Sequence, residues 1–184
     1  MKQAVLLHGT GGKPEGSWRP WLKAKLEAER YSVWVPELPD GENPKREVYN
    51  DFLLGSGRYF TDGIVVGHSS GAASVLNMLM DERCPKIKLG VMVSFWEYGV
   101  PPGRDEEHVR NLFPPNGFDY ELIKSKAAKL AFLQSDNDTV APLEQIENLA
   151  HKLNASFTVV HNGDHLGSPR TELPELWQII EPNL

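Results

Sequence analysis

Six short aliphatic runs recur along the chain, and each is nearly continuous rather than alternating with polar residues. They lie at residues 4–9, 32–36, 63–68, 89–95, 130–136 and 157–162. A strand covered on both faces needs apolar side chains on both faces, so this pattern is typical of the strands of a buried parallel sheet. The runs therefore constrain the fold more than any other feature of the sequence.

Amphipathic helical patterns separate these runs. One helical face is shared by Trp18, Trp21, Leu22 and Leu26, a second pattern spans 143–153, and "ELPELWQII" closes the chain. Because strand and helix patterns alternate, we expect an α/β fold: a doubly wound, mostly parallel sheet of about six strands with helices on both faces. At 184 residues and without internal repeats, residues 1–184 are expected to form a single domain.

Charge and composition exclude several classes of protein. The formal net charge is −6 and no Lys/Arg cluster is present, which argues against a nucleic-acid partner. The apolar run at the N-terminus is too short for a signal peptide, and no stretch approaches the length of a membrane span. We therefore expect a cytoplasmic protein, in which the single cysteine, Cys84, has a structural role.

Residues 63–71, "GIVVGHSSG", end a buried run abruptly at small and polar residues. Gly67 and Gly71 could be ordinary turn residues, and Ser69 or Ser70 could cap the following helix. Alternatively, residues 67–71 form a G-x-S-x-G turn between a strand and a helix, in which Ser69 is exposed above the sheet. In that geometry a Cβ atom at either glycine would collide with the neighbouring backbone.

Polar residues of particular types follow the other runs. Ligands of parallel sheets bind at the carboxyl ends of the strands, so these residues are candidates for a site. A serine needs a base, and the base needs an acid to hold its tautomer. The glycine loop after the first run offers the backbone N–H groups of Thr10 and Gly11, which could join that of Ser70 to stabilise an oxyanion. The polar residues are His8, Thr10, His68, Ser69, Ser94, Asp136, Asp138, His161, Asp164 and His165.

Four segments, "LLHGTGG", "VVGHSSG", "SDNDTVAP" and "GDHLG", fall in the order and spacing of the α/β-hydrolase superfamily. Together with the Trp-rich "SWRPWLKAKL", the chain resembles the compact branch of that superfamily, the retinoblastoma-binding-protein serine hydrolases and their bacterial relatives. The resemblance implies a fold without a lid domain. It also implies Ser69 as nucleophile, Asp138 as acid and His165 as base, with oxyanion N–H groups from Thr10 and Ser70.

Other histidines compete for the role of base. We expect His8 and His68 to orient loops around the serine, and His161, at the end of its strand, to be structural. His165 is preferred because "NGDHLG" is a glycine-bracketed loop that can fold back over the sheet.

Two aspartates compete for the role of acid. Asp136 and Asp138 both precede the helix that Pro142 is expected to begin, and either could be a turn residue. The S-x-x-D spacing from Ser135 favours Asp138, and Asp164 is interpreted as loop structure.

The glycine loop does not fit a nucleotide site. "GTGGKP" lacks the G-x-G-x-x-G spacing, and Pro14 stands where a P-loop needs Ser or Thr. The histidines and the cysteine show no metal-ligand spacing, so we expect neither a metal nor a cofactor.

The longest connection, 94–120, carries several aromatic residues and leaves two interpretations open. It could form an aromatic wall over Ser69, or it could be a packed loop with a short helix at 105–112. The candidate substrate-binding residues are Phe95, Trp96 and Trp18, although Trp18 also fits a core position.

These patterns together predict a serine hydrolase that cleaves a small carboxylic ester or amide through an acyl-enzyme. The alternative is a non-catalytic protein-binding module on the same scaffold, because fold alone does not determine function. The oligomeric state is not indicated.

Overall fold

Six parallel strands form one sheet in the computed structural model, which describes residues 2–184. Each strand lies on one of the six aliphatic runs, so the predicted sheet is confirmed. All five residues of the central strand β3 are buried, which explains why its sequence has no polar face. The order across the sheet is β2-β1-β3-β4-β5-β6. The strands are β1 (Lys2–Leu7), β2 (Tyr31–Trp34), β3 (Ile64–His68), β4 (Ile87–Val93), β5 (Ala127–Ser135) and β6 (Ser156–Val160).

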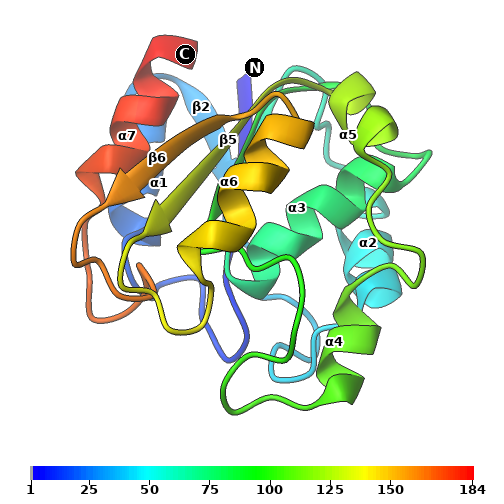
Figure 1. The fold of residues 1–184 in the computed structure, drawn as a ribbon. Coiled ribbons are helices and arrows are strands. Elements are labelled where there is room, and N and C mark those ends of the chain that lie inside the picture. The colour runs from blue at the N-terminus through cyan, green and yellow to red at the C-terminus, as the bar shows by residue number, and fades with distance from the viewer. Residues whose placement is uncertain (1) are drawn as a thin grey trace.

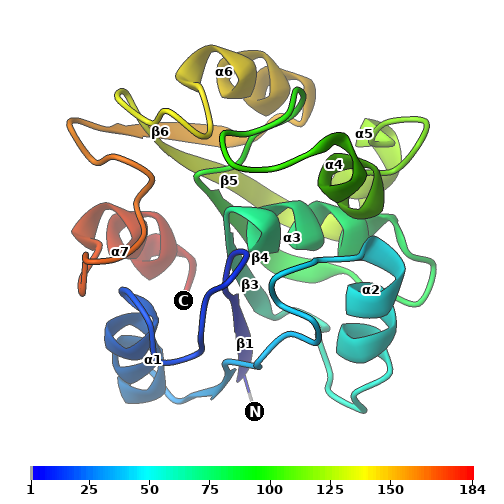
Figure 2. The same ribbon diagram turned by 90° about the horizontal axis from the view of Figure 1, so that it is seen from below.

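Helices cover both faces of the sheet (Figures 1 and 2). α1 (Arg19–Ala28) and α7 (Pro174–Ile180) lie on one face, and a short 3-10 helix, Glu181–Asn183, follows α7. Each face has its own apolar core, so the chain folds as three layers. The helices of the other face are α2 (Arg46–Leu54), α3 (Ser70–Met80), α4 (Glu106–Leu112), α5 (Tyr120–Lys126) and α6 (Leu143–Lys152).

Helices α1, α3, α6 and α7 occupy the predicted helical patterns, and α4 begins one residue after the expected 105–112. Helices α2 and α5 were not predicted. Among the helices of residues 2–184, none combines the length and apolar character that a membrane span needs.

The strand order reverses at β1, which pairs with β2 on one side and β3 on the other. Connections after β1 and β3 therefore leave the sheet in different directions and open a crevice between them. Leu7 is level with Gly67 in the register, so the two strands end side by side. The loops after β1 and β3 consequently meet at this crevice.

Candidate active site

Ser69 stands on the turn between β3 and α3 in an unusual backbone conformation. Its φ and ψ are 55° and −121°, a region that residues other than glycine rarely adopt. Ser69 occupies the N-cap position of α3, but its side chain makes no capping hydrogen bond, so a capping role of this side chain is wrong. The turn instead directs the hydroxyl away from the helix and toward the carboxyl ends of the strands.

Gly67 and Gly71 permit this turn because the backbone passes too close for any side chain. A Cβ atom at Gly67 would lie 2.1 Å from the carbonyl oxygen of Gly71, and one at Gly71 would lie 2.6 Å from that of His8. Both distances are far below contact distance. The steric interpretation of the two glycines is confirmed.

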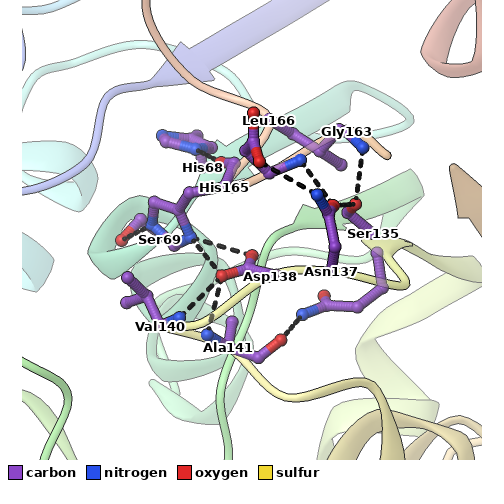
Figure 3. A network of polar contacts seen from close by, with 12 residues as sticks. His68, Ser69, Ser135, Asn137, Asp138, Val140, Ala141, Gly163, His165 and Leu166 are labelled. Atoms are coloured by element: carbon purple, nitrogen blue, oxygen red, sulfur yellow. Dashed lines mark hydrogen bonds and ion pairs between the residues drawn. The ribbon is translucent and has the colours of Figure 1, made fainter. Parts of the chain in front are cut away.

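Ser69, His165 and Asp138 lie in a hydrogen-bonded line (Figure 3). His165 Nε2 is 3.0 Å from Ser69 Oγ, and its Nδ1 is 2.9 Å from Asp138 Oδ2 and 3.1 Å from Oδ1. A carboxylate accepts, so Nδ1 carries the proton and Nε2 is free to accept from the serine hydroxyl. The structure thus brings together the three residues that the sequence singled out.

Asp138 is held as a carboxylate in a buried position. Its side chain is 0 % exposed, and Oδ1 also accepts from the backbone N–H groups of Val140 and Ala141 at 2.8 and 2.9 Å. Burial opposes its ionisation, but the hydrogen bond and charge of His165, together with these two N–H groups, outweigh burial and lower the pKa of Asp138. The carboxylate is therefore fixed both in charge and in orientation.

A network of polar contacts joins the loop after β5 to the loop that carries His165 (Figure 3). Ser135 Oγ donates to Asn137 Oδ1 at 2.7 Å and accepts from the N–H of Gly163 at 2.8 Å. Asn137 also donates to Asp164 at 3.0 Å, which agrees with the predicted loop role of Asp164. These contacts fix His165 relative to Asp138.

His68 and Trp18 support the same loop from its other side. His68 Nε2 donates to the carbonyl of His165 at 2.7 Å, and Trp18 Nε1 donates to that of Leu166 at 2.8 Å. Burial, and then the neighbouring charge of His165, lower the pKa of His68 to about 3, so it is neutral at physiological pH. Trp18 is 0 % exposed and does not line the cavity described below, so its assignment as a substrate-binding residue is wrong and its core position is confirmed.

His8 and His161, the two other histidines considered as base, take no part in the hydrogen bonds that join Ser69, His165 and Asp138. His8 Nε2 accepts from the N–H of Leu38 at 3.0 Å, so its Nδ1 carries the proton and donates to the carbonyl of Gly9. His161 contacts Asp136 at 2.7 Å in a second Asp–His pair, but its side chain is 83 % exposed. This second pair has no hydrogen bond to Ser69.

Backbone N–H groups of Thr10 and Ser70 flank Ser69. Gly11 donates its N–H to the carbonyl of Gly41 at 2.9 Å, so this N–H group is not free to stabilise an oxyanion. Within residues 2–184, the N–H groups of Thr10 and Ser70 have no hydrogen-bond acceptor. The Oγ1 of Thr10 donates to Ser70 Oγ at 2.9 Å and so ties the two loops together.

A cavity of about 470 Å³ opens over Ser69 and His165. Trp96 lines it, as do residues of the connection 94–120 that follow it. Phe95 is 0 % exposed and packs against Phe113, Phe118 and Phe132, so its assignment as a substrate-binding residue is wrong. The connection therefore combines the two interpretations: Trp96 faces the cavity, and the phenylalanines belong to the core.

Sequence reasoning missed four basic residues that line this cavity: Lys13, Arg19, Arg104 and His108. Arg19 is 3 % exposed and lies on a helix face that is otherwise apolar. A charged residue within the pattern "SWRPWL" was the signal that could have identified it. No such signal marks Arg104 or His108, because both lie in a polar segment.

Sheet order, strand-to-helix turn and crevice define the α/β-hydrolase class of protein. Residues 4–180 match the family described as "Serine hydrolase", and the chain belongs to that family. It is therefore an enzyme of the hydrolase class rather than a non-catalytic binding module.

Similar proteins span the whole chain. YdeN of Bacillus subtilis (strain 168) is 26 % identical over 97 % of this chain and 94 % of its own. The serine hydrolase RBBP9 of Rattus norvegicus is 22 % identical over 99 % of this chain and 95 % of its own. The crystal structure of the B. subtilis ydeN product superimposes with a TM-score of 0.89 at 22 % identity, covering 100 % of this chain and 98 % of that structure. The structure of Est1E from Butyrivibrio proteoclasticus with bound ferulic acid gives a TM-score of 0.75 at 15 % identity, covering 100 % of this chain and 89 % of that structure.

Proposed function

We propose that the enzyme hydrolyses small carboxylic esters or amides through an acyl-enzyme, with Ser69 as nucleophile, His165 as general base and Asp138 as its orienting acid. The observation that carries the proposal is the line of hydrogen bonds from Ser69 through His165 to the buried Asp138. A serine hydroxyl is a weak nucleophile, and this arrangement gives it a neutral imidazole nitrogen at 3.0 Å.

In the first half of the reaction Ser69 Oγ forms a bond to the carbonyl carbon while its proton passes to His165 Nε2. The tetrahedral intermediate then collapses, the bond to the leaving group breaks, and His165 returns the proton to that group. In the second half a water molecule forms a bond to the acyl carbon while one of its protons passes to His165 Nε2; the bond from that carbon to Ser69 Oγ then breaks, the carboxylic acid leaves, and His165 returns the proton to Ser69 Oγ. Asp138 stabilises the imidazolium that forms in each half.

The oxyanion of both intermediates is assigned to the backbone N–H groups of Thr10 and Ser70. Both are without an acceptor within the described chain, and both flank Ser69. Donors of this kind, fixed before the reaction begins, stabilise the developing charge without reorganisation.

Labelling with a fluorophosphonate probe tests the assignment of the nucleophile. The wild-type enzyme should be labelled, Ser69→Ala should not, and Ser70→Ala, which keeps its backbone N–H, should retain labelling. Attachment at Ser70, or labelling that survives in Ser69→Ala, would contradict the proposal.

A further inference from the structure

The cavity over Ser69 is lined by cations and by no anion. Lys13, Arg19 and Arg104 line it together with His108, whereas no aspartate or glutamate does so among residues 2–184. This contrasts with the net charge of −6 for the whole chain. The positive lining is therefore local to the cavity.

Arg19 is the most unusual member of this group because it is buried without a carboxylate partner. Its Nε and Nη2 donate to the carbonyl of Lys13 at 3.2 and 2.8 Å, and its Nη1 has no acceptor within residues 2–184. Burial lowers the pKa of Arg19 to about 10, so it is charged at neutral pH. The guanidinium also lies over the Trp18 ring at 5.8 Å, but no carboxylate of residues 2–184 is within hydrogen-bond distance of it, and a buried charge is costly unless it is paired.

Nearby acidic residues do not neutralise the cavity. Glu37 pairs with Lys13 at 2.5 Å on the exposed surface, and Glu42 lies against the backbone of Gly11. Glu15 attracts the charge of Arg19 from a distance but makes no hydrogen bond or ion pair with it. The cationic groups left without a carboxylate at hydrogen-bond distance are therefore Arg19 and Arg104.

Trp96 also lines the cavity. Its ring is 3 % exposed, and the buried Nε1 has no hydrogen-bond partner within the described residues. A guanidinium and an indole N–H both donate and cannot accept. The cationic lining, with Arg19 lacking a carboxylate partner, therefore favours a ligand that offers hydrogen-bond acceptors and negative charge.

We infer that the substrate carries a carboxylate in addition to its scissile ester or amide, and that Arg19 binds this carboxylate, with Arg104 at the mouth of the cavity. A guanidinium matches a carboxylate in planar, bidentate geometry. The inference rests on the proposed function, since it assigns a substrate class to the same site.

Two matched pairs of esters test the inference. The 4-nitrophenyl monoester of glutarate is compared with 4-nitrophenyl valerate, which places the charge in the acyl part, and 4-acetoxybenzoate with 4-acetoxybenzamide, which places it in the leaving group. For each pair we take the ratio of kcat/KM, anionic over neutral. In Arg19→Met this ratio should fall about tenfold or more in at least one pair, because a hydrogen-bonded charge pair is lost.

Two further variants control the measurement. Arg110→Met removes the same charge from an exposed position of α4 outside the cavity, so its ratios should change by less than about twofold. Arg104 is exposed, and Arg104→Met should lower the ratio more than Arg110→Met does, which keeps the test available if Arg19→Met does not fold. Equal ratios in wild type, Arg104→Met and every folded Arg19 variant would overturn the inference.

Binding measured without turnover separates this inference from the proposed function. Titration of Ser69→Ala protein with glutarate should give a Kd that rises about tenfold or more when Arg19→Met is added. If Ser69 is not labelled by the fluorophosphonate but glutarate binding depends on Arg19, the proposed function fails and the anion site stands. If labelling succeeds but neither glutarate binding nor the ratios depend on Arg19 or Arg104, the inference fails and the proposed function stands.

Discussion

Asp136 and Asp138 are two residues apart, and each contacts a histidine, yet their surroundings differ. The side chain of Asp138 is 0 % exposed and that of its partner His165 28 %, compared with 34 % for Asp136 and 83 % for His161. An exposed pair is screened by water and contributes little, whereas a buried one holds its geometry. Burial therefore distinguishes the pair that can orient a catalytic base.

Substitution of each aspartate by asparagine tests this difference. Asp138→Asn should stay folded and lower kcat on an activated ester by about 10⁴-fold, because the amide favours the wrong tautomer of His165 and does not stabilise its cation. Asp136→Asn, the matched control, should lower kcat by less than about fivefold. An inactive Asp136→Asn beside an active Asp138→Asn would reverse the assignment.

At the level of single residues, the sequence predicts which chemical types follow each strand better than it predicts where side chains point. Asp138, His165 and Ser69 were identifiable because loops after parallel strands converge. Trp18 and Phe95 were misassigned because an aromatic residue near a strand end can face the cavity or the core. Tertiary packing decides between these directions, and no local pattern encodes it.

Among the elements, the turn between β3 and α3 places the strictest demand on residue type. Gly67→Ala should fail to reach the native fold or lose more than about 4 kcal/mol of unfolding free energy, because the new Cβ would overlap the carbonyl of Gly71. Gly57→Ala is the control: its Cβ meets nothing within 4 Å, so it costs only the strain of a φ of 73°, about 1–2 kcal/mol. If urea denaturation gives Gly67→Ala and Gly57→Ala the same loss of unfolding free energy, the steric explanation is wrong.

Helices α2 and α5, unlike the strands, were not predicted from the sequence. All six strands were predicted: the inner strands are largely buried and aliphatic, and the edge strands β2 and β6, although only partly buried, still lie on β-branched and aromatic residues. Helix α5 has seven residues and buries only Ile123, while α2 buries three residues that include the polar Asn50. Such short helices depend on tertiary contacts and on caps such as Asp119 rather than on an apolar periodicity.

Trp18, just before α1, links that helix to the loop of His165. Trp18→Phe should cost about 1–3 kcal/mol of unfolding free energy, because the carbonyl of Leu166 loses its buried donor. Its KM for 4-nitrophenyl esters should change by less than about twofold, since Trp18 does not line the cavity. Trp96→Phe should show the larger change in KM, and the opposite ranking of the two variants would place Trp18 in the substrate site.

For the whole molecule, buried neutral histidines make stability depend on pH. Below the ordinary histidine pKa of 6.5 the unfolded chain binds a proton at position 68 that the folded chain does not, since burial and His165 lower the pKa of His68 to about 3. The free energy of unfolding should therefore decrease as the pH falls from 6.5 toward 3. The lowered pKa of His8, caused by burial, acts in the same direction, and that of Asp138 adds a loss at still lower pH.

The comparison variant is His68→Gln, which has an amide donor but no titrating group. Its free energy of unfolding, followed by urea denaturation between pH 7 and pH 4, should decrease less steeply than that of the wild type. Parallel curves for the two proteins would show that His68 does not carry this dependence.

The central claim is that hydrolysis proceeds through an acyl group on Ser69, and acid-quenched mass spectrometry tests it most directly. The enzyme is mixed with excess 4-nitrophenyl acetate, stopped within the first turnover, and its peptides are mapped. A burst of 4-nitrophenol should accompany an acetyl group on the peptide that contains Ser69, and both should be absent in Ser69→Ala. Undiminished turnover by Ser69→Ala, or an acetyl group on any other residue of the active wild type, would contradict the account.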